Sequence, residues 1–367
     1  MDFHPEVVGR APGRVNLIGE HTDYNSGLCL PLALPRAASA AVASRSDGSL
    51  EVHSESFPDP WRGTVEGLAP GADPGWAGYV TGVLWAMRQG GLDVPGLEIR
   101  IDSDVPIGAG LSSSAALECA VAVAVAGLLE LPLTERVRER LAHACVRAET
   151  EYVGAPTGGM DQTVSMLATE GSALLIDFDD DTTRHVPLPL AEDGLTLVVT
   201  DTGVSHAHAT GGYADRRSEC EAAADALRLD SLRQASPADL DRLTDDRLRH
   251  RARHVVTENA RVTEAVDAIE RRDWPALGGL LDASHHSLRD DFEVSCPELD
   301  LAVTTAREAG ALGARLTGGG FGGSIVSVVP EERAGAVTTA LDVAFAAAGL
   351  GAPMHLTATA SAGASVG

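Results

Sequence analysis

The sequence predicts a two-domain protein of the α+β class. Its 367 residues favour two domains over one, and its hydrophobic content of 44% supports a full globular core. Hairpin-like alternating segments are mixed with longer segments of helical periodicity. This mixture favours an α+β architecture over a doubly wound parallel sheet.

The first half of the chain is expected to begin with a β-hairpin. Two alternating segments, 37–44 and 49–56, are joined by Ser46-Asp47-Gly48, a turn-forming sequence. Residues 57–75 are rich in Gly, Pro and Asp and predict a surface loop. The remaining expected elements of this half are a strand over 97–102 and helices over 76–90, 112–130 and 134–152.

The second half is expected to start beyond an acidic, proline-containing segment at 178–194. This segment lies between strands expected at 174–178 and 195–200, and it is the best candidate for a domain boundary. We therefore expect one domain over 1–183 and another over 184–367. Expected further on are helices over 213–229, 248–272, 298–309 and 331–349, and strands over 324–329 and 354–360.

The composition excludes several classes of function. A net charge of −25 argues against nucleic acid or an anionic membrane surface as the main partner. All 28 basic residues are arginines, so phosphate-binding loops that depend on lysine are excluded. Any phosphate must be held by backbone amides, helix N-termini, metal or arginine. Five dispersed cysteines and an N-terminus without a signal peptide predict buried thiols in a cytoplasmic protein.

A dense polar cluster follows the apolar run that ends at Ile18. Glu20, His21 and Asp23 lie within four residues, and Arg14 precedes them. Acceptors, donors and a fixed cation on one short loop suit a hydroxyl-rich small molecule. The alternative is a solvated turn between two strands.

A glycine-rich turn leads into an apolar helix at 105–118. Glycines allow a ligand to approach the backbone, and a helix N-terminus binds anions through free N–H groups and its dipole. Three serines open this helix, and one of them could bind Mg²⁺. The alternative is a simple serine N-cap. The candidate phosphate-binding residues are Gly108, Ala109, Gly110, Leu111, Ser112, Ser113 and Ser114.

Three further features are less specific. A second glycine-rich run, 316–324, predicts a backbone that passes close to a ligand or to another loop. Asp161 follows a glycine-rich bend and is either an N-cap or a site carboxylate. The residues alone leave the general base open among Asp161, Glu20, His21 and Asp23. Tyr213, after a Gly-Gly turn, faces a ligand or packs in the core.

Three segments together resemble the GHMP small-molecule kinase family, and the first resembles the galactokinases within it. They are Gly13–Tyr24 (GRVNLIGEHTDY), Pro106–Ala116 (PIGAGLSSSAA) and Thr317–Gly323 (TGGGFGG). The second and third mark the family as a whole, whereas the first is more specific. The resemblance implies an N-terminal domain like ribosomal protein S5 domain 2, and a C-terminal ferredoxin-like α/β sandwich.

The resemblance also implies transfer of the ATP γ-phosphate to the anomeric hydroxyl of α-D-galactose, with Mg²⁺ as cofactor. Asp161 would be the catalytic base or hydroxyl-orienting carboxylate, and Arg14 would stabilise developing charge. The sugar would be bound by Arg14, Glu20, His21, Asp23, Gly158, Asp161 and Tyr213. Mg²⁺ would be bound by Ser113 or Ser114 with Glu149. The third motif, with Gly318, Gly319, Gly320, Gly322 and Gly323, would support the phosphate loop.

Alternative functions stay open within the same resemblance. One is a sibling kinase for L-arabinose or N-acetylgalactosamine, since the sequence does not show the volume of the sugar pocket. Another is a non-catalytic sugar sensor, which the intact Ser114-Ala115 and Arg14 disfavour. We expect a monomer that binds sugar and ATP.

Overall fold

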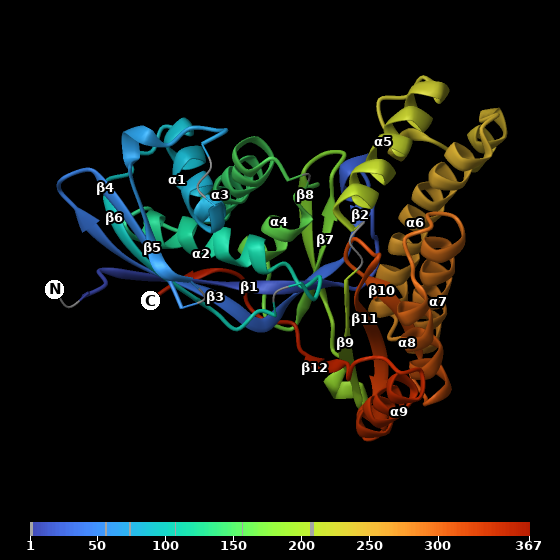
Figure 1. The fold of residues 1–367 in the computed structure, drawn as a ribbon. Coiled ribbons are helices and arrows are strands. Elements are labelled where there is room, and N and C mark those ends of the chain that lie inside the picture. Colours follow the sequence, from blue (N-terminus) through green and yellow to red (C-terminus); the bar gives the residue numbers. More distant parts are fainter. Residues whose placement is uncertain (1–2, 56, 73–74, 107, 156, 206–208) are drawn as a thin grey trace.

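The computed structural model describes residues 3–55, 57–72, 75–106, 108–155, 157–205 and 209–367. Figure 1 shows two lobes joined side by side. The lobe formed mainly by the first half of the chain carries both termini, and the other lobe carries a group of long helices against a sheet. The expected α+β architecture is confirmed.

The first lobe is built on a six-stranded sheet in the order β13-β1-β3-β6-β4-β5. Helix α2 lies across this sheet, and its residues from Ala115 to Ala126 are apolar except for Glu118, as is typical of a buried helix. Gly9 permits the contact, because a Cβ there would lie 2.2 Å from the Ala120 carbonyl oxygen of α2. The strands are β1 (Val7–Asn16), β3 (Pro31–Arg45), β4 (Ser49–Ser54), β5 (Phe57–Thr64), β6 (Gly96–Ser103) and β13 (Ser365–Val366). The helices are α1 (Gly78–Gln89), α2 (Ser113–Leu128), α3 (Glu135–Arg147) and α4 (Met160–Leu167).

The expected hairpin over 37–56 is wrong in its pairing. Both strands exist, but β6 lies between them, antiparallel to β3 and parallel to β4. Strand β4 instead forms its hairpin with β5, inside the segment expected to be a loop. A local turn sequence predicts which residues reverse the chain. It does not predict that a strand about 40 residues further along the chain inserts between the two strands that the turn connects.

The second lobe has a four-stranded antiparallel sheet in the order β10-β11-β9-β12. Helix α7 was not expected, because Gly278 and Gly279 lower its helix propensity. Gly278 serves packing, since a Cβ there would lie 2.0 Å from the Leu312 carbonyl oxygen. The strands are β9 (Leu195–Ser205), β10 (Gly313–Thr317), β11 (Gly322–Pro330) and β12 (Met354–Ala358). The helices are α5 (Ala209–Leu227), α6 (Asp246–Glu270), α7 (Trp274–Asp290), α8 (Pro297–Glu308) and α9 (Ala334–Ala347).

A three-stranded sheet, β2 (Leu28–Cys29), β7 (Ser172–Asp177) and β8 (Thr182–Pro187), lies where the lobes meet. Strand β8 falls in the segment expected to link the domains, and its mostly exposed side chains give no apolar alternation. The boundary at 183/184 lies within β8 and stays a prediction. After β12 the chain returns to the first lobe, where β13 pairs with β1, so both termini lie together in Figure 1.

Short elements and the cysteines complete the description. A π-helical turn, Ala148–Val153, continues α3. Short 3₁₀ helices cover Asp23–Asn25, Val65–Gly67, Gly75–Ala77, Ala191–Asp193, Leu232–Gln234, Pro237–Arg242 and Glu331–Arg333. All five cysteines are buried and free, as expected. Among the described residues, no helix is both long and apolar enough to cross a membrane.

Candidate active site

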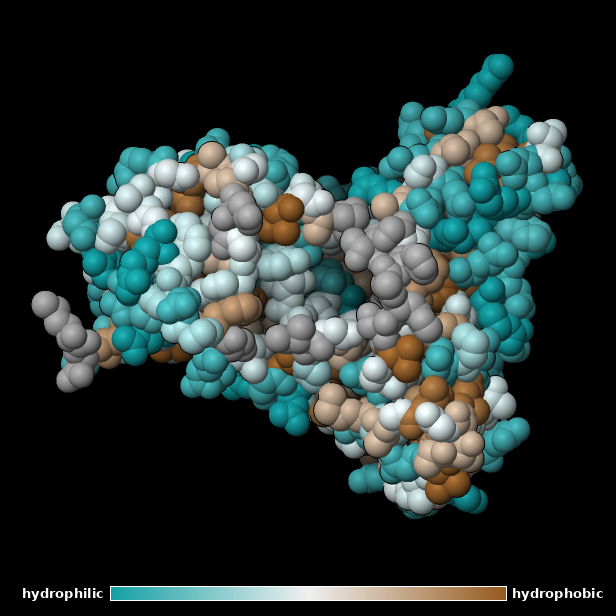
Figure 2. Space-filling view, viewed as in Figure 1, coloured by the Kyte–Doolittle hydropathy of each residue, from teal (hydrophilic) through white to brown (hydrophobic). Residues whose placement is uncertain are grey.

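A polar cavity of about 180 Å³ collects the candidate residues from both halves of the sequence. Figure 2 shows the surface hollowed between the two lobes, with hydrophilic residues inside the hollow. The cavity is lined by Arg14, Glu20, His21, Asp23, Glu149, Thr157, Met160, Asp161, Tyr213, Gly318 and Gly319. Residues expected to hold sugar, metal and the glycine-rich loop therefore share one site.

Arg14 and Asp161 form a two-point ion pair in this cavity. Arg14 Nε donates to Asp161 Oδ1 at 2.8 Å, and Nη2 donates to Oδ2 at 3.0 Å. Arg14 Nη1 also donates to the Gly110 carbonyl oxygen at 2.6 Å, and Ser112 Oγ donates to Asp161 Oδ2. The guanidinium is nearly fully buried, whereas the carboxylate keeps 24% of its side chain exposed toward the cavity. Asp161 is thus fixed by charge-assisted hydrogen bonds and remains accessible from the cavity.

The local fold explains why these two side chains meet. The pairing of β1 with β3 shifts register between Pro12 and Arg14, and Gly13 lets the chain pass beside Leu111. On the other side, Gly159 takes a left-handed conformation (φ +99°) that starts α4. Asp161 therefore sits in the first turn of a helix, where the dipole also favours a carboxylate.

The polar loop after β1 is anchored by the second lobe. Glu20 is buried, and its Oε1 accepts hydrogen bonds from the Gly318 N–H at 2.8 Å and from Thr317 Oγ1 at 3.1 Å. His21 Nε2 donates to the Gly319 carbonyl oxygen, and its Nδ1 accepts from the Tyr24 hydroxyl. Burial and the nearby His254 lower the pKa of His21 to about 3, so the ring is neutral. These contacts hold the loop in place, which favours a preformed binding site over a solvated turn.

Asp23 is pressed against the Gly158 backbone. A Cβ on Gly158 would lie 2.0 Å from Asp23 Oδ2, so only glycine fits there. Burial, with the nearby carboxylates of Asp161 and Glu20, raises the pKa of Asp23 from 3.8 to about 7. A raised carboxyl pKa means that the folded state holds the proton more tightly. The stability that Asp23 contributes is therefore lost as the pH rises through about 7.

Tyr213 is the fifth residue of α5, so the Gly-Gly turn expected before the helix is part of the helix. The preceding Gly212 gives room to the ring of Phe321, which a Cβ would approach to 2.5 Å. The Tyr213 ring lies 5.3 Å from that of His21 and 5.4 Å from that of Tyr24. Tyr213 thus packs against other rings and also lines the cavity, and its contact with a ligand stays a prediction.

The second motif forms a turn with three left-handed residues before α2. Gly108 (φ +82°), Gly110 (φ +72°) and Ser112 (φ +61°) lead to Ser113, the first residue of the helix. Ser112 does not cap the helix with its side chain but contacts Asp161. Ser114 Oγ lies 3.5 Å from Glu149 Oε1. The simple N-cap interpretation is therefore wrong.

The third motif is the connection between β10 and β11, and it contacts both other motifs. Ser324 Oγ donates to the Ala109 carbonyl oxygen at 2.6 Å. A Cβ on Gly318 would lie 3.3 Å from the Gly110 carbonyl oxygen, and one on Gly323 would lie 3.5 Å from that of Ala109. Through the contacts of Gly318 and Gly319 described above, this connection also holds the polar loop that follows β1. The expected approach to another loop is therefore observed, and the expected approach to a ligand stays a prediction.

Glu149, on the π-helical turn after α3, belongs to a small buried network. Its Oε2 accepts from Gln162 Nε2 at 2.5 Å, and the same nitrogen donates to Glu118 Oε2 at 3.0 Å. Burial and the charge of Asp161 raise the pKa of Glu149 to about 7. Burial, then Glu149, raises the pKa of Glu118 well above its usual range. Sequence reasoning missed Glu118 and Gln162, although Glu118 is the single charged residue in the sequence of α2.

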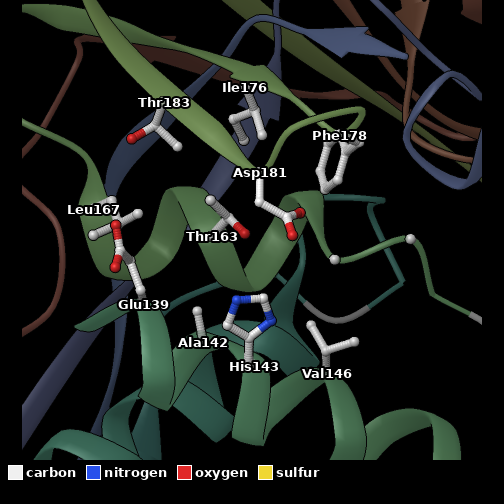
Figure 3. A pocket seen from close by; sticks show the side chains of 12 residues that line it. Glu139, Ala142, His143, Val146, Thr163, Leu167, Ile176, Phe178, Asp181 and Thr183 are labelled. Atoms are coloured by element: carbon white, nitrogen blue, oxygen red, sulfur yellow. The ribbon is translucent and has the colours of Figure 1, made fainter. Parts of the chain in front are cut away.

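A second cavity, of about 190 Å³, lies behind the Gly158–Gly159 bend. Figure 3 shows it between α3, α4 and the β7–β8 strands, with Thr163, Asp181 and His143 turned toward its interior. Gly159 lines this cavity, and a Cβ there would lie 3.3 Å from Cγ2 of Val146 in the same wall. Among the candidate residues, Gly158 lines this second cavity, whereas Arg14, Glu20, His21, Asp23, Glu149, Asp161, Tyr213, Gly318 and Gly319 line the first.

The sequence contains two pairs of closely spaced histidines, His206 with His208 and His285 with His286. His206 and His208 lie outside the described residues. His285 is buried and pairs with Asp300 at 3.2 Å, whereas His286 is exposed.

The fold and the three joined motifs define a small-molecule kinase of the GHMP class. Residues 78–169 match the description "GHMP kinases N terminal domain", and residues 265–347 match "GHMP kinases C terminal". Residues 2–44 match the "Galactokinase galactose-binding signature". A mevalonate kinase structure shares the fold, with a TM-score of 0.69 at 16% identity over 96% of this chain and 98% of that one.

Full-length relatives narrow the class to one family. The sequence is 51% identical to the galactokinase of Streptomyces coelicolor, over 98% of this chain and 94% of that one. It is 44% identical to the galactokinase of Mycobacterium tuberculosis, over 94% of both chains. The galactokinase of Lactococcus lactis, crystallised with galactose, has a TM-score of 0.93 at 31% identity, over 98% of this chain and 95% of that one. The chain belongs to the galactokinase family.

Proposed function

We propose that this protein transfers the γ-phosphate of ATP to the anomeric hydroxyl of α-D-galactose. The observation that carries the proposal is the Arg14–Asp161 pair, placed between a hydroxyl-binding wall and a helix N-terminus in one cavity. This arrangement would supply a carboxyl group for the acceptor hydroxyl and a buried cation for the migrating phosphoryl group. Phosphoryl transfer needs mainly such positioning and charge stabilisation.

The sugar would bind against the polar loop and α5. The carboxylates of Glu20 and Asp23 would accept hydrogen bonds from sugar hydroxyls, and Tyr213 would close the pocket. His21 already uses both ring nitrogens within the protein, so a sugar hydroxyl would replace one of these partners. Gly158 would keep this wall of the pocket in place by fitting against Asp23. In this position the 1-hydroxyl would face Asp161.

The triphosphate would bind at the Gly108–Ser114 turn. The turn exposes backbone N–H groups at the N-terminus of α2, and the dipole of this 16-residue helix favours anions there. Arg14 links this turn to Asp161 through the Gly110 carbonyl oxygen. With no lysine in the sequence, these amides and Arg14 would carry the phosphate contacts that lysine makes elsewhere.

The residues present fit a magnesium ion. Mg²⁺ takes one or two protein oxygen ligands and completes its shell with phosphates and water. Ser114 Oγ and Glu149 Oε1, 3.5 Å apart beside the helix N-terminus, supply such oxygens, and Ser113 is the alternative serine. Among the described residues, no group of three His, Cys, Asp or Glu side chains could hold a metal by itself. Bound there, Mg²⁺ would neutralise charge on the transferring phosphates.

The direct test is ATP consumption with a panel of free sugars. We expect turnover with galactose and a product phosphorylated at the anomeric carbon, identified by ³¹P NMR. Faster turnover with L-arabinose or N-acetylgalactosamine would move the proposal to a sibling sugar kinase. Sugar binding without ATP consumption would replace it with a sensor.

Cellular setting and assembly are part of the same proposal. We propose a cytoplasmic monomer, and the five free thiols suit a reducing compartment. Light scattering coupled to size-exclusion chromatography would check the monomer.

A further inference from the structure

We propose that Glu118 and Gln162 form a buried positioning pair for the carboxylate of Glu149. The pair would fix the orientation of the Glu149 carboxylate at the metal-binding end of the cleft. Neither residue of the pair would contact substrate, metal or nucleotide. This inference rests on the proposed role of Glu149 as a magnesium ligand.

Glu118 lies where an acidic residue is costly. Its side chain is fully buried in α2, and the neighbouring positions are Cys119, Ala120 and Val121. Burying a carboxyl group costs several kcal/mol unless hydrogen bonds compensate. An aliphatic residue would pack there without that cost, so stability alone does not account for a glutamate.

The hydrogen bonds of Gln162 show what Glu118 can do. One amide nitrogen donates to Oε2 of Glu118 and to Oε2 of Glu149. A glutamine side chain can present either its nitrogen or its oxygen to a neighbour. The nitrogen end faces both carboxyl groups. Glu118 thus gives the amide nitrogen a second acceptor, which helps to hold Gln162 in the orientation that donates to Glu149.

This bond also sets the direction of the free oxygen of Glu149. With Oε2 held by Gln162, Oε1 faces Ser114 Oγ. Ser114 and Glu118 are four residues apart on α2 and so lie on one face of the helix. One helix thus places the serine directly and the carboxylate through Gln162.

The network is incomplete in a way that suits a functional site. Glu118 Oε1 and Gln162 Oε1 are buried without a hydrogen-bond partner in the described part of the chain. A network selected for stability would satisfy both atoms, since each unpaired buried group is destabilising. Partners that orient a metal ligand typically change metal affinity by about 10- to 100-fold when removed.

The experiment measures nucleotide binding, not turnover. ATP affinity is determined by calorimetry at increasing Mg²⁺ and without sugar, for the wild type, Glu118→Leu, Glu118→Gln and Gln162→Leu. We expect Glu118→Leu and Gln162→Leu to need about tenfold more Mg²⁺ for the same ATP affinity. Glu118→Gln should stay near the wild type, because its amide oxygen still accepts from Gln162.

Val123→Ala is the matched control, since it removes buried volume from the same helix away from the network. It should lower the melting temperature and leave the Mg²⁺ dependence unchanged. A folded Glu118→Leu or Gln162→Leu protein with wild-type Mg²⁺ dependence would overturn the inference. If Glu118→Leu does not fold, Gln162→Leu tests the inference by itself.

Glu149→Gln in the same titration separates this inference from the proposed function. If Glu149→Gln raises the Mg²⁺ concentration needed for ATP binding and Gln162→Leu does not, the positioning pair is refuted and the magnesium ligand stands. If Glu149→Gln changes nothing, the metal role of Glu149 fails and the inference fails with it.

Discussion

Replacing Asp161 by asparagine separates chemistry from binding in this cleft. The change removes the charge and keeps the size of the side chain. An asparagine cannot hold the acceptor proton or carry the negative charge that the Arg14 guanidinium faces. Because a positioned acid or base contributes about 10²- to 10⁴-fold, we expect kcat to fall by that factor. This corresponds to about 3–5 kcal/mol in the activation barrier.

The same change has a cost in stability that the contacts define. Asp161 accepts two hydrogen bonds from Arg14 and one from Ser112. The asparagine amide offers one acceptor and one donor, so Arg14 loses one charged partner. Hydrogen bonds to charged groups contribute about 1.5–3 kcal/mol, so we expect the free energy of unfolding to fall by about 2 kcal/mol.

The assay couples ADP release to an optical signal and compares ATP affinity in a separate binding titration. ATP affinity should be close to that of the wild type, because the Gly108–Ser114 turn is unchanged. Asp273→Asn is the control, since it also replaces an aspartate at a helix start, but at the N-cap of α7, away from the cleft. A folded Asp161→Asn enzyme with wild-type kcat would refute the role of Asp161.

Three further changes test the site from other sides. Arg14→Ala should lower kcat by about 10²- to 10³-fold, more than it raises KM; a rise in KM alone would make Arg14 a binding residue only. Gly158→Ala should raise the KM for galactose and lower stability by about 1–3 kcal/mol, because the new methyl group collides with Asp23; unchanged KM and melting temperature would show that the bend adapts. Between pH 5 and pH 8, the free energy of unfolding of Asp23→Asn should rise by about 2 kcal/mol relative to that of the wild type. This rise is smaller than the full pKa shift implies, because Asp23 is half-buried. Urea unfolding across this pH range measures the difference, and a constant difference would contradict the raised pKa of Asp23.

The fold class and most elements follow from the sequence because periodicity is local. Helices α1, α2, α6 and α8 have long apolar patterns, and the structure contains each of them. The position of β6 between β3 and β4 could not be predicted, since strand order depends on pairing across the chain. Strand β8 was missed because its side chains are mostly exposed, and α7 was missed because glycine packing overrides helix propensity.

The candidate site was predictable where chemistry is concentrated in one segment. Arg14, Glu20, His21 and Asp23 could be selected as a cluster in the sequence, and the cavity contains them all. The pairing of Arg14 with Asp161 joins residues 147 positions apart, so only the resemblance to a family connected them. Glu118 could have been selected from the sequence, because a single charged residue in an otherwise uncharged, mostly apolar helix needs an explanation.

A crystal structure with galactose and a non-hydrolysable ATP analogue tests the central claim most directly. The account predicts the sugar 1-hydroxyl within about 2.6–3.2 Å of an Asp161 oxygen, and the phosphates against the backbone amides that precede α2. Phosphates bound away from that helix start, or a sugar whose 1-hydroxyl faces away from Asp161, would contradict it.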